Sequence, residues 1–172
     1  MAAALHPVAA HAGYNIFTDQ LTFTRDEILA QIARRFPVSA GAAGLMECVL
    51  SHPGLTLRPV ANRLEVTADL RITTPLLDQP AAGVIAISTG LWFDKARLSI
   101  CLARPQADRI ELRGLAPQEA AQLQAAGGAL AAEVLRDYPL HTFRPEELRV
   151  GRRQFSVESI TVTDTGLTVQ LA

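Results

Sequence analysis

One tripeptide in the sequence carries residue types that do chemistry in other proteins, Asp164-Thr165-Gly166. In aspartic proteases, two aspartates held close together share one proton and activate water. Only six residues follow the tripeptide here, which is too short for the substrate-binding segment and flap of a protease half. Strand-forming residues flank it, and glycine suits a turn position with positive φ. We therefore interpret it as the turn of a β-hairpin.

The side chains that bind metals or act as nucleophiles are scattered. No two of the four histidines have the i,i+4 or H-x-H spacing that places two imidazoles on one metal. No serine lies in a G-x-S-x-G elbow, and no glycine-rich loop has the spacing that binds phosphate. The sequence therefore predicts no catalytic residue, no metal site and no cofactor, although a hydrolase with an unrecognised site stays a third, less favoured hypothesis.

The two cysteines, Cys48 and Cys101, are predicted to lie on different faces of a sheet and to form no disulfide. Arginines at 144, 149, 152 and 153 form a basic cluster. They are suited to phosphate groups of lipid heads, but Glu146 and Glu147 lie among them, which favours an ordinary solvated surface.

Composition excludes several classes of function. The chain has 172 residues, of which 49% are hydrophobic, and a net charge of −1. This is typical of a folded domain without the basic field that attracts nucleic acid, and the few aromatic residues are poor material for stacking bases. No stretch reaches the roughly 20 apolar residues of a membrane-spanning helix.

The first twelve residues, MAAALHPVAAHA, differ in composition from the rest. Ala10-His11-Ala12 before Gly13 has the form of a signal-peptidase site, although no basic segment precedes it. We expect residues 1–12 to be the remnant of an export signal and residues 13–172 to form a single domain. The alternative is an alanine-rich start without function.

Periodicity predicts the elements of that domain. Leu21–Phe23 alternates like a strand, and Thr24-Arg25-Asp26-Glu27 is a capping box that begins a helix over 25–36. In Asn62–Ile72 the even-numbered residues are apolar and the odd-numbered ones polar, which indicates an antiparallel strand with one wet face. Further strands are predicted at 46–50, resuming at 55, and at 84–87 and 91–93, with Gly90 as a bulge.

The second half continues this pattern. Apolar residues at even positions from Ala96 to Leu112 predict one long, bent strand. A helix is predicted from Pro117 to about Arg136, and a hairpin over 156–163 and 167–171. The helix carries Gly127-Gly128 at its centre, where each glycine costs about 1 kcal/mol relative to alanine. The order predicts an α+β fold.

These segments resemble a known family. Leu21–Ile28, the helix end Leu135–Leu140, and the hairpin residues Ser159–Val162 and Gly166–Val169 resemble, in order and spacing, the YceB-like family of bacterial envelope lipoproteins. The resemblance covers nearly all of the chain after Gly13. It implies a fold similar to the tubular lipid-binding superfamily, in which a strongly curved antiparallel sheet wraps around a long C-terminal helix, with a short N-terminal helix.

The resemblance further implies an exported, non-catalytic protein that binds a lipid or other hydrophobic molecule. We expect the ligand in an apolar groove between the curved sheet and the long helix, lined by Ile28, Ile32, Leu98, Ile100, Leu102, Leu123, Gly127, Leu130 and Val134. The alternative is a structural or protein-interaction module of the envelope with a solid core. Peripheral membrane contact is compatible with either, and the sequence does not indicate an oligomeric state.

One feature departs from the family. Its members often carry a lipobox cysteine at the cleavage site, whereas position 13 is glycine here and no cysteine is near. If the chain is exported, the sequence therefore predicts a soluble periplasmic protein without a lipid anchor.

Overall fold

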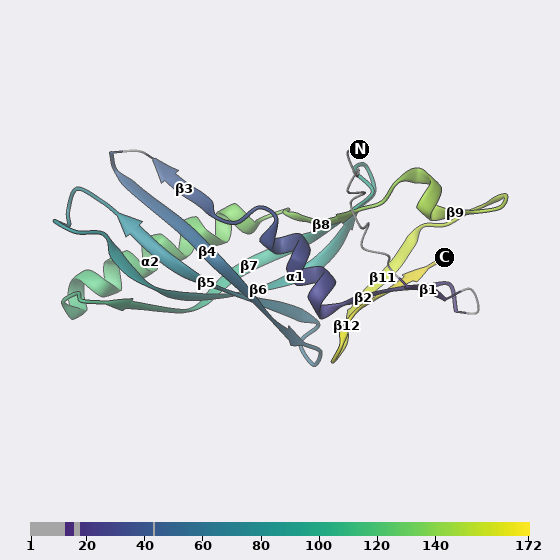
Figure 1. Ribbon diagram of the computed structural model, residues 1–172, viewed down its shortest axis with the longest axis horizontal. Helices are drawn as coiled ribbons and strands as arrows, with labels where there is room; N and C mark the ends of the chain where they lie inside the picture. The colour runs from purple at the N-terminus through teal and green to yellow at the C-terminus, as the bar shows by residue number, and fades with distance from the viewer. Residues whose placement is uncertain (1–12, 16–17, 43) are drawn as a thin grey trace, which may run out of the picture.

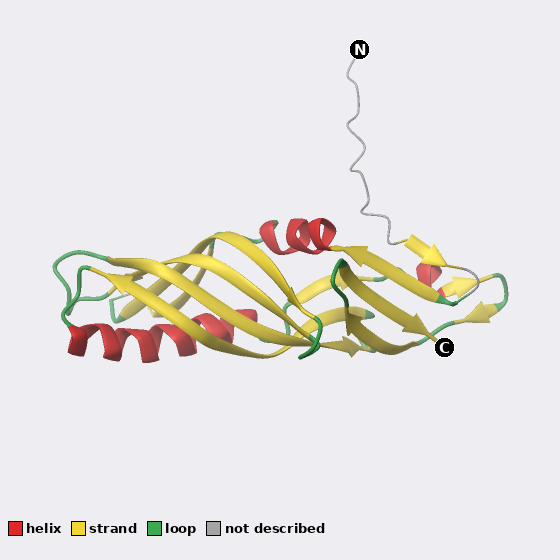
Figure 2. Cartoon of the chain, turned by 90° about the horizontal axis from the view of Figure 1, so that it is seen from below, coloured by secondary structure: helices red, strands yellow, loops and turns green. Residues whose placement is uncertain are grey.

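The computed structural model describes residues 13–15, 18–42 and 44–172. It is an α+β fold with two main sheets and two α-helices (Figures 1 and 2). Residues 1–12, where we expect the export signal, lie outside the described residues. The elements in chain order are β1 (Gly13–Asn15), β2 (Gln20–Thr24), α1 (Arg25–Ala33), β3 (Val38–Ala42), β4 (Met46–Arg58), β5 (Arg63–Thr73), β6 (Ala81–Asp94), β7 (Ser99–Arg113), α2 (Pro117–Leu135), β8 (Pro139–Thr142), the 3₁₀ helix η1 (Pro145–Leu148), β9 (Arg149–Val150), β10 (Arg153–Gln154), β11 (Val157–Val162) and β12 (Gly166–Leu171).

The larger sheet is strongly curled. Its six antiparallel strands have the order β3-β4-β5-β6-β7-β8. Helix α2 packs against both β7 and β3, which are four strand positions apart. In a flat sheet those strands would be roughly 19 Å apart, whereas a helix with its side chains is about 10 Å wide. One helix therefore touches both strands only because the sheet curls towards it.

The strands predicted in the first half are present, but the predicted break between 50 and 55 is wrong. In β5 the even-numbered residues from Leu64 to Ile72 are buried. Strand β4 runs without a break through Pro53-Gly54, with an irregular register between Ser51 and Gly54. The β6–β7 pairing does shift register between Ser88 and Gly90, but the extra residue is in β7, so the predicted bulge at Gly90 is on the wrong strand.

Strand β7 is the predicted long strand, but its inward face changes twice. Pairing with β6 skips one residue of β7 near Arg104-Pro105 and another at Asp108. Each extra residue reverses which side chains face inward. Leu102 is buried at an even position, Pro105 is buried at an odd one, and Ile110 returns to the even set. The predicted even-numbered face is therefore correct at both ends of the strand and wrong between the bulges. The turn before β7 extends to Leu98, which we expected inside the strand.

Helix α1 begins where the capping box predicts. The backbone N–H of Glu27 donates to Thr24 Oγ1 at 3.2 Å, and the N–H of Thr24 donates to Glu27 Oε2 at 2.7 Å. These two bonds satisfy donors that a helix start otherwise leaves free. The helix ends at Ala33, three residues before the predicted end at Phe36.

The smaller sheet was not predicted. It has the strand order β1-β2-β12-β11, so the hairpin near the C-terminus pairs with a strand near the N-terminus. The turn at Asp164-Thr165 is confirmed, but our reason for the glycine is wrong. Gly166 has no positive φ, and a Cβ there would run into the carbonyl oxygen of Phe23 on β2. Close approach of two backbones, and not turn geometry, requires this glycine.

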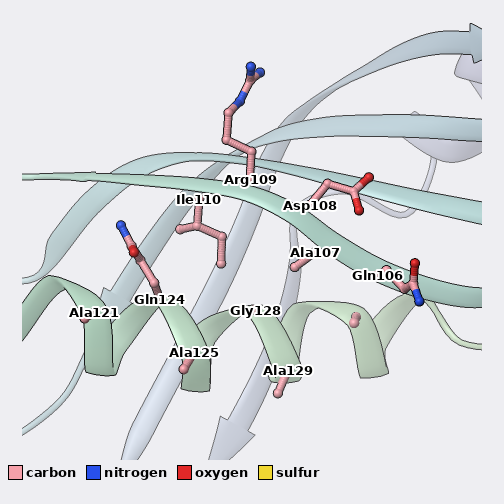
Figure 3. Close-up of a pocket in the computed structure, with 11 residues that line it drawn as sticks. Gln106, Ala107, Asp108, Arg109, Ile110, Ala121, Gln124, Ala125, Gly128 and Ala129 are labelled. Atoms are coloured by element: carbon pink, nitrogen blue, oxygen red, sulfur yellow. The ribbon is translucent and has the colours of Figure 1, made fainter.

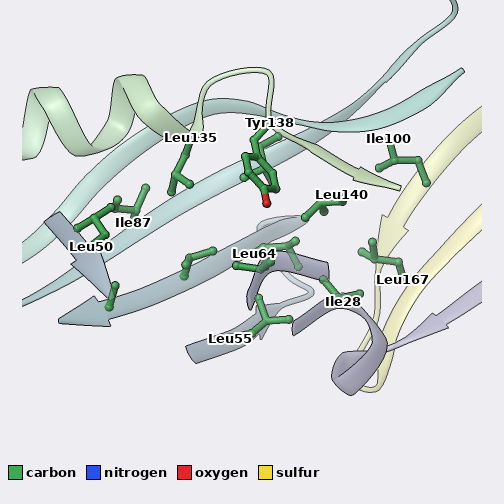
Figure 4. Close-up of a cluster of buried hydrophobic side chains, with 14 of the residues drawn as sticks. Ile28, Leu50, Leu55, Leu64, Ile87, Ile100, Leu135, Tyr138, Leu140 and Leu167 are labelled. Carbon is green, nitrogen blue, oxygen red and sulfur yellow. The ribbon is translucent and has the colours of Figure 1, made fainter. Parts of the chain in front are cut away.

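The long helix is not C-terminal in this fold. Figure 1 shows α2 beside one half of the curled sheet, after which the chain returns through β8 to form β11 and β12. Wrapping of the sheet around a C-terminal helix is therefore not confirmed. Figure 4 shows the core that both sheets and both helices share, in which Leu64 and Ile87 of the curled sheet, Ile28 and Leu135 of the helices and Leu167 of the small sheet belong to one cluster.

Candidate ligand-binding site

The buried face of α2 is in direct contact with the sheet. It consists of Leu123, Gly127, Gly128, Ala131 and Leu135. A Cβ at Gly127 would lie 2.9 Å from Ile72 Cδ1 and 3.8 Å from Cys48 Sγ. A Cβ at Gly128 would lie 2.9 Å from Ile110 Cδ1 and 3.2 Å from Ala107 Cβ. The two glycines therefore let the helix approach β5 on one side and β7 on the other.

The structure distributes the nine predicted groove residues over several places. Gly127 and five of the apolar residues are buried, and those five belong to the core: Ile28, Ile32, Ile100, Leu102 and Leu123. Leu98 lies in the β6–β7 turn. Leu98 and Leu130 are half-buried and pack against the core, and Val134 of α2 is also half-buried. Ile28 and Ile100 line a narrow cleft, whereas Leu123 lines a separate pocket. Ligand contact by these residues stays a prediction, and Ile28 and Ile100 line a different cavity from Leu123.

That separate pocket, which we call the end pocket, lies at the end of the curled sheet away from the small sheet. Its volume is about 330 Å³. Three segments line it: the turn between β3 and β4, the loop between β5 and β6, and the first half of α2, all at the left of Figure 1. Their lining residues are Leu45, Met46, Thr74, Leu76, Leu77, Glu119, Gln122, Leu123 and Ala126.

The mouth of the end pocket exposes large apolar side chains. Leu45 is 73% exposed and Leu76 is 85% exposed. Both side chains therefore leave apolar surface in contact with water, as at binding sites for apolar partners. A second pocket of about 290 Å³ adjoins it and shares Leu45 and Thr74. Sequence periodicity missed these residues because they lie in turns, where no face is repeated. The signal was the Leu76-Leu77 pair between two prolines, an apolar pair in a segment otherwise typical of a loop.

Another groove runs between β7 and α2. It has a volume of about 580 Å³, and Figure 3 shows Ala107 and Ile110 of β7 above Gly128 of α2. Beyond Cys101 no strand pairs with the outer edge of β7 in the described part of the chain. The helix side of the groove is made of Ala121, Gln124, Ala125, Ala129 and Ala132. Because its helix side has small side chains and its strand edge has free backbone groups, this groove is better suited to bind an extended peptide than a lipid chain.

The cleft that Ile28 and Ile100 line is too small for a ligand. Its volume is about 10 Å³, roughly the room for one water molecule. His141 borders it and packs edge-on against Phe143, with ring centroids 4.5 Å apart. Burial lowers the pKa of His141, and the charge of Glu147 opposes that change. We assign this ring a structural role.

The other candidate groups form no reactive constellation. Cys48 and Cys101 are free, buried thiols, and burial raises the pKa of each. Among residues 13–15, 18–42 and 44–172, no three His, Cys, Asp or Glu side chains lie close enough to hold a metal ion. Within the same residues, no helix has the length and apolar character to cross a membrane.

Comparisons with known proteins identify no family. No family model matches the sequence, and no curated protein is significantly similar to it. Among solved structures, the crystal structure of lipopolysaccharide binding protein is similar over 88% of this chain, with a TM-score of 0.33 and 13% sequence identity. This chain spans 40% of the length of that protein. Similarity at this level indicates neither a shared family nor a shared ligand.

Proposed function

We propose that this protein binds a hydrophobic molecule, such as a lipid chain, in the end pocket without catalysing a reaction. One observation carries the proposal: an apolar pocket of about 330 Å³ whose mouth exposes two leucines. Pockets for small molecules are roughly 300–1,000 Å³ and are mostly apolar with a few polar groups. The end pocket has this character, with Thr74, Gln122 and Glu119 as its polar members.

The binding energy would come from burial of apolar surface. Each methylene group moved from water into the pocket contributes about 0.8 kcal/mol. A ligand shortened by two methylenes should therefore bind about tenfold more weakly. Covering Leu45 and Leu76 would add to the same term, because both side chains are largely exposed without a ligand.

Two neighbouring alanines of α2 allow a matched test. Both are exposed, but Ala126 lines the end pocket and Ala125 lines the groove beside β7. We expect Ala126→Trp to weaken binding of the uncharged dye N-phenyl-1-naphthylamine at least tenfold, because the indole fills the pocket. Ala125→Trp should leave the affinity unchanged. Fluorescence titration measures both, and thermal unfolding verifies that both variants fold.

Three outcomes would contradict the proposal. The wild-type protein would fail to bind the dye or any long-chain alcohol, or the two variants would lower the affinity equally, or Ala125→Trp alone would lose binding. The last result would place the ligand in the groove beside β7.

We also propose that the protein acts in the bacterial envelope as a soluble periplasmic protein. The resemblance to YceB-like proteins and the A-x-A pattern of residues 10–12 support this location. The relation to tubular lipid-binding proteins, with a sheet wrapped around the helix, belongs to the same proposal. Fractionation of cells that express the full chain tests it, and recovery of the protein solely in the cytoplasm would refute it.

A second candidate function is capture of an extended peptide on the edge of β7. The absence of a neighbouring strand along 103–113 in the described residues favours it. The two bulges near Arg104-Pro105 and at Asp108 act against it, because bulges and charges on an edge hinder strand addition. We therefore rank it below ligand binding.

A further inference from the structure

The charged residues around the end pocket have one sign. The end pocket and the pocket that adjoins it are lined by two charged side chains, Glu47 and Glu119, both exposed. No lysine, arginine or histidine lines either of them, although the chain has nearly as many basic as acidic residues. The polar head of a bound amphiphile would therefore lie beside two carboxylates.

The start of α2 carries a negative side chain of its own. The backbone N–H of Ala116 donates to Glu119 Oε2 at 3.4 Å, which holds the Glu119 carboxylate beside the first turn. Because this carboxylate already faces the positive end of the helix dipole, it repels a further anion there.

A buried hydroxyl between the two pockets supplies the remaining polar contact. Thr74 is 7% exposed and lines both pockets. Its Oγ1 accepts from the N–H of Leu76 at 3.4 Å and makes no other hydrogen bond within the described residues. Its oxygen thus keeps a second lone pair that can accept from an ammonium group on a ligand, and its hydrogen can serve a neutral acceptor such as an alcohol oxygen.

From this arrangement, and resting on the proposed function, we infer that the end pocket selects amphiphiles with a cationic head over those with an anionic head. The chain occupies the apolar part, and an ammonium group lies at the mouth near Glu47 and Glu119. Attraction to two carboxylates favours the cation, and repulsion from the same groups disfavours a carboxylate or phosphate head.

Three ligands with the same chain test the inference by displacing the uncharged dye. They are dodecylammonium and dodecanoate, each below its micelle concentration, and dodecanol, below its solubility limit. At low ionic strength we expect dodecylammonium to bind at least tenfold more tightly than dodecanoate, with dodecanol between them. The ratio should shrink as salt rises to about 0.5 M, because salt screens exposed charges.

Removal of the two charges gives the specific control. In the double variant Glu47→Gln and Glu119→Gln, the ratio should fall to within about threefold, and glutamine at 119 can still cap the helix. The matched double variant Glu133→Gln and Glu158→Gln changes two exposed carboxylates outside both pockets and should keep the full ratio.

These measurements distinguish a failure of the head-group inference from a failure of the proposed function. If dodecanol does not bind, the proposed function fails and the inference fails with it. If dodecanol binds but dodecanoate binds as tightly as dodecylammonium, or the ratio is insensitive to salt and to the double variant, the pocket binds apolar chains and the inference about the head is wrong.

Discussion

At the scale of single residues, two glycines show how the same residue type serves different needs. Gly166 follows a turn but is required because the backbone of β2 passes directly over it. Gly90 lies in β6 opposite a bulge of β7, and a Cβ there would make an ordinary contact with the carbonyl oxygen of Ala103 at 3.5 Å. Sequence spacing predicted the turn before Gly166 and an irregularity near Gly90, but no local pattern reveals a backbone contact between β2 and β12, which are about 140 residues apart.

These two positions give a matched prediction of stability. Gly166→Ala should lower the free energy of unfolding by more than about 2 kcal/mol, because the backbone of Phe23 must move. Gly90→Ala should change it by less than about 1 kcal/mol, since the contact is ordinary and alanine reduces the entropy of the unfolded chain. Urea titration measures both, and equal effects would show that the β2–β12 contact is not tight.

His141 gives a prediction about pH. Because burial lowers its pKa in the folded state, the unfolded chain binds its proton first as pH falls below about 6.5. The stabilising contribution of the neutral ring is therefore present above that pH and is lost on acidification. The free energy of unfolding should fall more between pH 7.5 and pH 5 in the wild type than in His141→Gln. If the free energy of unfolding falls equally in the two proteins, His141 does not cause the loss of stability at low pH.

At the scale of elements, the small residues of α2 set its distance from the sheet. The sequence left two interpretations of Gly127 open, a tight contact or the wall of a space. With Ile72 Cδ1 2.9 Å from where its Cβ would be, Gly127 marks a tight contact. The buried stripe is also rotated by about one residue from the predicted face, because Ala131 and Leu135 face the sheet while Ala126 is exposed.

This contact predicts a cost for a large side chain. Gly127→Leu should destabilise the protein by about 1–3 kcal/mol, the usual range for overpacking a core. Ala129→Leu, on the exposed side of the same helix, should be nearly neutral. Thermal unfolding compares the two, and a stable Gly127→Leu variant would indicate free space beneath the helix.

Much of the secondary structure could be predicted because it depends on local signals. The capping box at Thr24 and the alternation in β5 need only neighbouring residues. The bulges of β7 could not be predicted, since each depends on how β6 pairs beside it. Only Leu123 of the predicted groove lines the end pocket, because loop residues such as Leu45 and Leu76 carry no periodic pattern.

At the scale of the whole molecule, the two ends have different chemistry. Figure 1 places the loops and the helix start that line the end pocket at one extremity, and the β9–β10 hairpin at the other. The exposed Leu45 and Leu76 belong to the first of these ends. The arginine cluster lies at the second end, with Arg149, Arg152 and Arg153 in the hairpin and Arg144 just before η1. Arg153 pairs with Asp19 at 3.6 Å, and Arg144 pairs with Glu147 at 3.6 Å. Between them, Asn62 joins the two sheets, donating to the carbonyl of Ile160 at 3.2 Å and accepting from the N–H of Val162 at 2.7 Å.

Because the two ends are far apart in the molecule, the position of a bound ligand can be assigned to one of them. A long-chain alcohol with a photoreactive diazirine on its chain, irradiated with the purified protein and mapped by peptide mass spectrometry, measures it directly. The account predicts crosslinks to the segments that line the end pocket, within 44–47, 74–77 and 119–126. Crosslinks found solely in residues 106–110 of β7 or in the β9–β10 hairpin would contradict this position of the ligand. A complete absence of crosslinks would contradict it as well.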